Sequence, residues 1–193
     1  KFHEETDHKI VAAYCVPEVD KKTIDPVKKY AQSNNIPLFQ PSNFNEEKVI
    51  NQIKSHDADL CIMAYVNIFL PEVARNTPKY GSICFHPSLL PLHRGPSSIN
   101  WPIIGGAKKT GLTIFYPNNG LDEGDILLQK EVEINPDDTL GDVYFSKIFQ
   151  LGVNSCVEAA NLIATGKAPR ITQDESKATY ESWCKKSKAK INW

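Results

Sequence analysis

The sequence lacks the features that mark membrane and nucleic-acid-binding proteins. No apolar run reaches the roughly 18 residues needed to cross a bilayer, so a membrane partner is not expected. The 22 lysines and arginines nearly balance the 23 aspartates and glutamates, which gives a formal net charge of −1. Because nucleic-acid binding depends on excess positive charge, we do not expect this part of the chain to bind a nucleic acid.

The cysteines also argue against a zinc-finger protein and against a protein held together by disulfides. They are odd in number and widely scattered, at positions 15, 61, 84, 156 and 184, and no two have the spacing of a zinc-binding knuckle. A disulfide framework is therefore not expected, and reduced thiols indicate a cytoplasmic location. The chain also has no Gly-x-Gly-x-x-Gly or other phosphate-binding loop.

The first hundred residues alternate apolar runs with turn signals, the rhythm of an α/β fold. The predicted strands lie at 9–16, 37–39, 59–64 and 81–85, and the predicted helices at 26–34, 45–55, 71–76 and 97–104. Near-continuous apolar strands are typical of a parallel sheet that is covered on both faces.

The later part of the chain has a different pattern. Strands are predicted at 111–116 and 126–134 with only a turn-rich loop between them, which indicates an antiparallel pair at the sheet edge. A long helix should follow, capped by Asp138 and closed by Gly166. Its expected core stripe is Leu140, Val143, Tyr144, Ile148 and Leu151.

Two polar residues follow directly after apolar strands. His86 precedes a rigid loop with two prolines, and Asp122 lies in the glycine-containing turn after the next predicted strand. Because ligands bind at the carboxyl ends of strands in open α/β sheets, we expect both side chains on one rim. A carboxylate there can fix the tautomer of the imidazole, order a water and support acid–base chemistry on a carbonyl.

Simpler interpretations remain open for each residue. A lone histidine after a strand is often structural, Asp122 could be an ordinary turn residue, and Asp125 leads into a strand and is expected to be structural. His86, His93, Asp122 and Asp125 could form a metal site, but no helical spacing or third nitrogen ligand supports one, so no metal is expected.

Three motifs together resemble the folate-dependent formyltransferase superfamily. They are Cys-Phe-His-Pro-Ser-Leu-Leu-Pro at 84–91, Thr-Gly-Leu-Thr at 110–113 and Asp-Glu-Gly-Asp at 122–125. The sequence is most similar to the N-terminal hydrolase domain of 10-formyltetrahydrofolate dehydrogenase, through 86–101, 120–131, 166–170 and 189–193. The resemblance implies a Rossmann-like formyltransferase fold, a mostly parallel sheet with helices on both faces.

The resemblance also implies domain boundaries. Residues 1–166 would be the catalytic domain, with the family's first strand and helix missing before residue 1. Residues 167–193 would be an extended linker toward a C-terminal domain that is absent here.

One residue departs from the family pattern. Transferases of the family have an asparagine where this chain has Cys84, and its amide helps to hold the oxyanion of the tetrahedral intermediate. A thiol is a weak donor. The dehydrogenase's hydrolase domain also lacks this asparagine, which favours hydrolysis, although Cys84 could simply be a small buried residue of a transferase.

The implied substrate or formyl donor is 10-formyltetrahydrofolate, which water would attack to give formate and tetrahydrofolate. His86 and Asp122 would be catalytic, together with the position of Cys84. The pterin slot would be lined by Tyr65, Val66, Asn67, Ile68, Phe69, Leu70, Asn118, Asn119, Gly120 and Leu121. Formyl transfer to methionyl-tRNA or a sugar-nucleotide amine, or folate binding without catalysis, are the alternatives.

Overall fold

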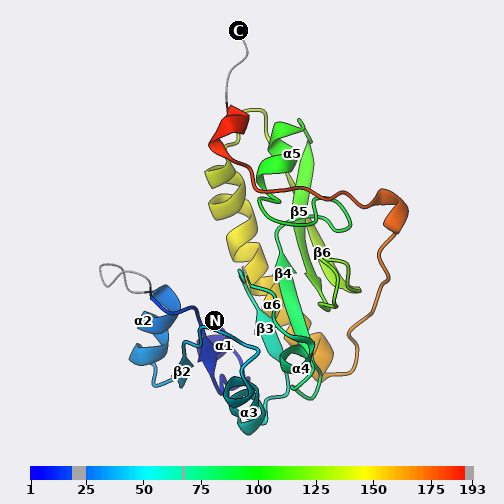
Figure 1. The fold of residues 1–193 in the computed structure, drawn as a ribbon. Coiled ribbons are helices and arrows are strands. Elements are labelled where there is room, and N and C mark those ends of the chain that lie inside the picture. Colours follow the sequence, from blue (N-terminus) through cyan, green and yellow to red (C-terminus); the bar gives the residue numbers. More distant parts are fainter. Residues whose placement is uncertain (19–24, 67, 190–193) are drawn as a thin grey trace. The chain divides into compact units, whose positions relative to one another are not determined.

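The computed structural model describes residues 1–18, 25–66 and 68–189 (Figure 1). The chain divides into two compact units. One consists of Lys1–Cys61 and Ile68–Gly81, and the other of Ile62–Asn67 and Ser82–Trp193. None of the described helices has the length and apolar character needed to cross a membrane.

The first unit contains short elements. They are α1 (Phe2–Glu5), β1 (Ala13–Tyr14), α2 (Pro26–Ser33), β2 (Leu38–Phe39), α3 (Glu47–Ser55) and α4 (Glu72–Arg75). β1 and β2 pair in parallel. The strand predicted at 9–16 is reduced to two residues because its partner lies between Pro37 and Pro41, which have no N–H to extend the ladder.

The second unit is built on a four-stranded sheet in the order β3 (Cys61–Met63), β4 (Ser82–His86), β5 (Lys109–Phe115), β6 (Ile126–Glu133). β4–β5 and β5–β6 are antiparallel, which confirms the predicted pair at the later edge. The remaining elements are α5 (Asn100–Ile104), a π-helical segment η1 (Asp142–Ile148), α6 (Phe149–Ala164) and the 3₁₀ turns η2 (Glu175–Lys177) and η3 (Lys186–Ala189). The predicted α/β class is confirmed.

One face of β4 and β5 packs against a helix. Phe85 pairs with Ile114 across the two strands, and Ile114 is fully buried. A methyl group added to Gly152 of α6 would lie only 2.6 Å from the Phe85 ring, so the helix backbone approaches the sheet closely at a glycine. Apolar burial on this face contributes to the stability of the unit.

The opposite face of the same strands carries polar residues and a loop. Cys84 pairs with Phe115, and His86 with Thr113, so strand alternation places all four on this face. The Thr113 hydroxyl donates to the Ser88 carbonyl at 2.7 Å and accepts from the Leu90 N–H at 3.1 Å. The loop after His86 is therefore fixed onto the sheet by hydrogen bonds.

The predicted cap and part of the predicted stripe of the long helix are wrong. Val143 and Ile148 are buried five residues apart, the spacing that a π-helix produces, whereas Leu140 is 40% exposed. Asp138 does not cap the helix, because it accepts from the N–H of Asn135 and pairs with Lys147.

Candidate functional site

His86 is the last residue of β4, and its side chain is held from both sides. Its Nε2 lies 2.9 Å from the carbonyl oxygen of His93. A carbonyl oxygen has no proton to give, so Nε2 carries the proton and donates. In the neutral ring, Nδ1 then has the free lone pair. His86 is 7% exposed, so this tautomer is set by a nearly enclosed environment.

Asp122 faces that nitrogen from the loop between β5 and β6. Its Oδ2 lies 3.6 Å from His86 Nδ1 and accepts from the Gly95 N–H at 2.8 Å. Its backbone has a φ of +57°, in the left-handed region that side chains rarely adopt. The structure thus brings together the two side chains that the sequence places on one rim.

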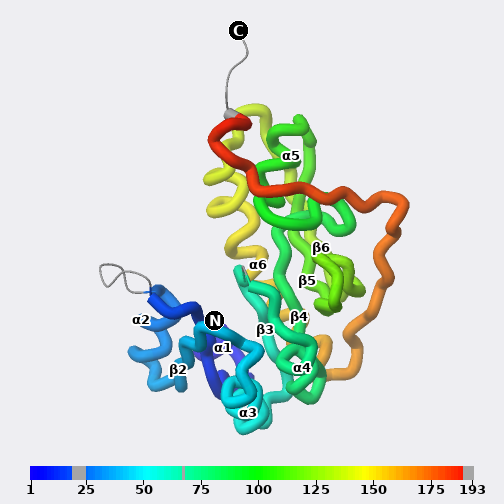
Figure 2. Tube along the Cα trace, in the orientation of Figure 1, coloured from blue at the N-terminus to red at the C-terminus, as the bar shows by residue number. Residues whose placement is uncertain are grey.

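The loop after His86 is bound by the chain's C-terminal segment, which the sequence predicts as an extended linker. Figure 2 shows this segment, in orange and red, turning back after α6 and crossing the second unit. The Thr179 hydroxyl accepts from the His93 N–H at 2.7 Å, and the Thr179 carbonyl accepts from the Arg94 N–H at 2.9 Å. A side chain at Gly95 would meet the Glu181 carbonyl at 2.6 Å.

Arg94 is the centre of this contact. Its side chain is fully buried and donates to both carboxylate oxygens of Glu175, at 2.9 and 2.6 Å. It also donates to the Tyr180 hydroxyl at 2.5 Å and to Gln173 Oε1 at 2.8 Å. The bonds from Arg94 hold the pKa of Glu175 below its ordinary value.

Sequence reasoning missed these residues of the C-terminal segment. Gln173, Glu175 and Tyr180 lie 79 to 86 positions from Arg94 and follow no helical or strand period. The one available signal was the concentration of polar side chains capable of several hydrogen bonds, at 172–181.

Cys84 lies two residues before His86 on the same face of β4. It is half-buried and packs against Leu90, Phe115 and Ile126, and its Sγ is 3.8 Å from the Phe85 carbonyl oxygen. The thiol is therefore on the same face of β4 as His86 and packs against an apolar cluster.

The predicted pterin slot is divided between the two units. In the second unit Tyr65 is 72% exposed, and Val66 and Leu121 are also exposed. In the adjoining loop Asn118 and Asn119 are exposed, and the Gly120 N–H donates to Asn118 Oδ1 at 2.9 Å.

The other predicted slot residues belong to the first unit or are not described. Ile68 and Phe69 are exposed, and the Arg75 guanidinium lies 5.4 Å from the centre of the Phe69 ring. Leu70 is buried, and Asn67 lies outside the described residues.

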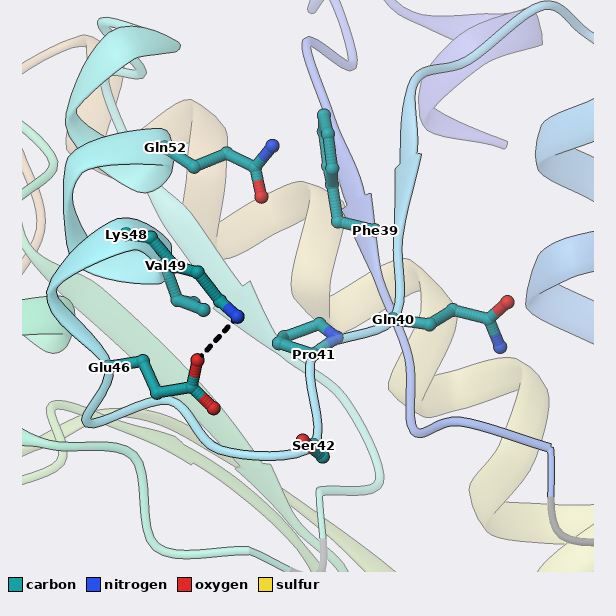
Figure 3. A pocket seen from close by; sticks show the side chains of 8 residues that line it. All are labelled: Phe39, Gln40, Pro41, Ser42, Glu46, Lys48, Val49 and Gln52. Atoms are coloured by element: carbon teal, nitrogen blue, oxygen red, sulfur yellow. Dashed lines mark ion pairs between the residues drawn. The ribbon is translucent and has the colours of Figure 1, made fainter.

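The remaining candidates have structural contacts. Asp125 accepts from the Thr172 hydroxyl at 3.3 Å. In the part of the chain that the structure describes, no three His, Cys, Asp or Glu side chains form a group that could hold a metal ion. A pocket of about 440 Å³ in the first unit, between the end of β2 and α3, contains none of the predicted site residues (Figure 3).

Solved structures show which fold this is. Phosphoribosylglycinamide formyltransferase from Anaplasma phagocytophilum superposes with a TM-score of 0.68 at 26% identity, covering 81% of this chain and 79% of that one. The formyltransferase PseJ from Anoxybacillus kamchatkensis, solved with a UDP-sugar and tetrahydrofolate, gives 0.65 at 26% identity, covering 92% and 88%. The fold is therefore that of the formyltransferases, as the resemblance implied.

Sequence comparison gives the family. A family model described as formyl transferase matches residues 10–159. The chain is 44% identical to the cytosolic 10-formyltetrahydrofolate dehydrogenase of Pongo abelii and 43% to that of Homo sapiens, over 96% of this chain in both cases. It spans about a fifth (21%) of the length of these dehydrogenases. A methionyl-tRNA formyltransferase of Alkaliphilus oremlandii is 36% identical over 98% of this chain and 62% of its own length.

The chain thus belongs to the folate-dependent formyltransferase family of enzymes. Its relatives include both dehydrogenases and transferases.

Proposed function

We propose that this chain hydrolyses 10-formyltetrahydrofolate to formate and tetrahydrofolate. The observation that carries the proposal is Cys84, a thiol packed among apolar side chains on the same face as His86. The identity of more than 40% with 10-formyltetrahydrofolate dehydrogenases, across nearly the whole chain, supports the same reaction. The cytosolic dehydrogenases among the relatives support a cytoplasmic location, although a mitochondrial dehydrogenase is 41% identical.

His86 is the base in this proposal. Since Nε2 is engaged with the His93 carbonyl, Nδ1 is the ring atom able to accept a proton. When Nδ1 takes that proton, the ring becomes positively charged next to the Asp122 carboxylate, 3.6 Å away. The opposite charge stabilises the imidazolium while the reaction proceeds.

Asp122 also orients the attacking water. Two atoms 3.6 Å apart can both lie about 2.8 Å from one water oxygen. The water oxygen attacks the formyl carbon as its proton passes to His86 Nδ1. The carbon–N10 bond then breaks, N10 takes the proton from the imidazolium, and the formic acid that leaves ionises to formate.

Cys84 bears on how well the developing oxyanion is stabilised. In an acyl transfer, a donor aimed at the developing oxyanion is worth about 3 kcal/mol, and a thiol replaces an amide poorly. The tetrahedral intermediate would lack that donor here with either nucleophile, so the proposal favours water because the His86–Asp122 pair can hold and activate it. The apolar contacts of Cys84 with Leu90 and Phe115 support this weak role.

Within the second unit, the folate would be bound by the exposed side chains of Tyr65 and Val66 and by the 118–121 loop. Tyr65 and Leu121 are large apolar groups exposed to solvent, and such groups commonly cover flat ring systems. The tetrahydrofolate in the PseJ structure supports a folate ligand for this family member as well.

Formyl transfer to an amine is the second candidate, because the methionyl-tRNA formyltransferase relative shares 36% identity over almost the whole chain. The deciding assay incubates the natural protein with 10-formyltetrahydrofolate alone, then with glycinamide ribonucleotide, an amino-sugar nucleotide or methionyl-tRNA. Formate release without an acceptor supports hydrolysis. Turnover that requires an amine contradicts it, and tight folate binding with no turnover under any condition marks a non-catalytic module.

A further inference from the structure

We propose that Gln173 is a positioning residue that sets the separation between His86 Nδ1 and the Asp122 carboxylate. The expected effect of Gln173 on kcat rests on the proposed function, whereas its expected effect on the distance between His86 and Asp122 does not. Gln173 is 5% exposed, lies outside the residues matched by the family model and touches neither reacting group through its own side chain.

The two groups that flank the His86 ring come from separate segments. The His93 carbonyl accepts from Nε2, and the Asp122 carboxylate faces Nδ1. Both residues have a left-handed backbone, with φ of +59° and +57°. Such conformations are strained and persist only where surrounding contacts hold them. Bonds from outside the two segments are therefore needed.

The amide of Gln173 joins these two segments. Its Nε2 donates to the Asp122 carbonyl at 2.9 Å and to the Gly124 carbonyl at 2.7 Å. Its Oε1 accepts from Arg94 Nε at 3.2 Å and from Arg94 Nη2 at 2.8 Å. Arg94 directly follows His93, so one side chain connects the segments on the two sides of the imidazole.

Only an uncharged amide can make all these bonds. The two carbonyls can only accept and the guanidinium can only donate, which fixes the orientation of the Gln173 amide. The four bonds use both N–H groups and both lone pairs of the amide, so its hydrogen-bonding capacity is fully satisfied. A carboxylate at 173 could still accept from Arg94 but could not donate to Asp122 and Gly124.

This asymmetry defines the test variant, Gln173→Glu. It keeps the Arg94 contact and places an oxygen against the Asp122 and Gly124 carbonyls. The loop carrying Asp122 should move away from His86. A shift of about 1 Å in a reacting group can lower the rate about a hundredfold, so we expect kcat for formate release to fall about 10- to 100-fold. KM for the folate should change less than about threefold, because the contacts that bind the substrate and the transition state equally well are retained.

The pH profile and a double mutant separate positioning from general stabilisation. If Gln173 acts through Asp122, the pH dependence of kcat should change in Gln173→Glu, and its effect should largely disappear in an Asp122→Asn background. Gln40→Ala is the matched control, because the Gln40 amide donates to the Val16 carbonyl at 2.9 Å within the first unit. It should leave kcat and the pH profile unchanged.

A folded Gln173→Glu protein with wild-type kcat and pH profile, or with an effect additive to Asp122→Asn, would overturn the inference. If that variant does not fold, Gln173→Met keeps the volume without the amide and is judged by the same criteria. Should the wild type release no formate, the proposed function fails, and a crystal structure of the variant still decides the positioning. An unchanged His86–Asp122 separation of 3.6 Å in that structure would refute it.

Discussion

The two faces of β4 and β5 are built from alternating residues of the same two strands, but different interactions hold them together. Phe85 and Ile114 lie on one face against α6, and their contribution is apolar burial. His86 and Thr113 lie on the other, where hydrogen bonds and ion pairs hold loops and the C-terminal segment in place.

Substitutions at residues that are neighbours in sequence should therefore have different effects, on stability at one face and on the reaction rate at the other. Apolar burial is non-directional and tolerates small shifts in position. The polar face depends on donor and acceptor geometry, and the left-handed residues His93 and Asp122 are held by bonds from distant parts of the chain. The helix-covered face should govern stability, and the polar face should govern the rate.

The largest effect should follow removal of the base or its partner. Loss of an acid–base group typically costs 10²- to 10⁴-fold in rate, so His86→Ala and Asp122→Ala should each lower kcat about 10³-fold. Folate affinity should stay within about tenfold, because both groups act mainly on the transition state. Formate release and folate binding by fluorescence titration measure the two quantities.

His3→Ala, at an exposed histidine of α1, is the control, and it should match the wild type in both formate release and folate binding. A His86 or Asp122 variant that turns over at the wild-type rate would remove that residue from the mechanism.

The opposite face should give the reverse result. Ile114→Ala removes a fully buried side chain and should lower the free energy of unfolding by about 3 kcal/mol. Because Ile114 points away from the site, kcat measured well below the unfolding temperature should remain within about twofold of wild type. Urea unfolding and formate release test both statements.

Ile104→Ala provides a matched comparison, since Ile104 is 57% exposed and its removal should cost less than about 0.5 kcal/mol. If Ile114→Ala instead reduced kcat in folded protein as strongly as it reduced stability, the two faces would not be functionally separate.

On the polar face, Cys84 should limit the rate of formyl transfer to an amine. Cys84→Asn introduces a strong neutral donor, so we expect formylation of an amine acceptor to rise about 10- to 10³-fold. Rates with water alone and with an added amine acceptor provide the measurement. Cys15→Asn, at a half-buried cysteine of the first unit, should change neither rate. No response to Cys84→Asn would mean that this cysteine only fills space.

The sequence predicted the elements that depend on local patterns. Alternating apolar runs located β4, β5 and β6 within a few residues, and the rule that ligands gather at strand ends brought His86 and Asp122 together. The family motifs fall on the same segments, so local pattern and resemblance agreed there.

The remaining features depend on contacts between distant parts of the chain. The π-helical segment buries Val143 and Ile148, as the predicted stripe requires, but leaves Leu140 exposed and Tyr144 only half-buried, which a regular 3.6-residue period does not predict. Gln173 and Arg94 were missed because a hydrogen bond across 79 positions leaves no periodic trace in the sequence. β1 was overestimated because an apolar run does not reveal where its partner strand ends.

The smallest expected effect concerns whether the polar face contributes to stability at all. The bonds from Arg94 lower the pKa of Glu175 below its ordinary value of 4.5 in the folded protein. The unfolded chain then binds a proton more readily, so this contribution is present above about pH 4.5 and is lost as pH falls through the lowered pKa.

Glu175→Gln should therefore be slightly less stable than wild type at pH 7, and this difference should shrink as the pH falls below 4.5. Urea unfolding of both proteins at several pH values measures it. Glu158→Gln is the control, because Glu158 pairs with the partly exposed Lys130 and not with a buried guanidinium, and screening by water leaves such a pair little effect. A difference between Glu175→Gln and wild type that stays constant with pH would show that Arg94 holds Glu175 without stabilising its charge. Glu175 would then contribute to stability through contacts that do not depend on the charge of its carboxylate.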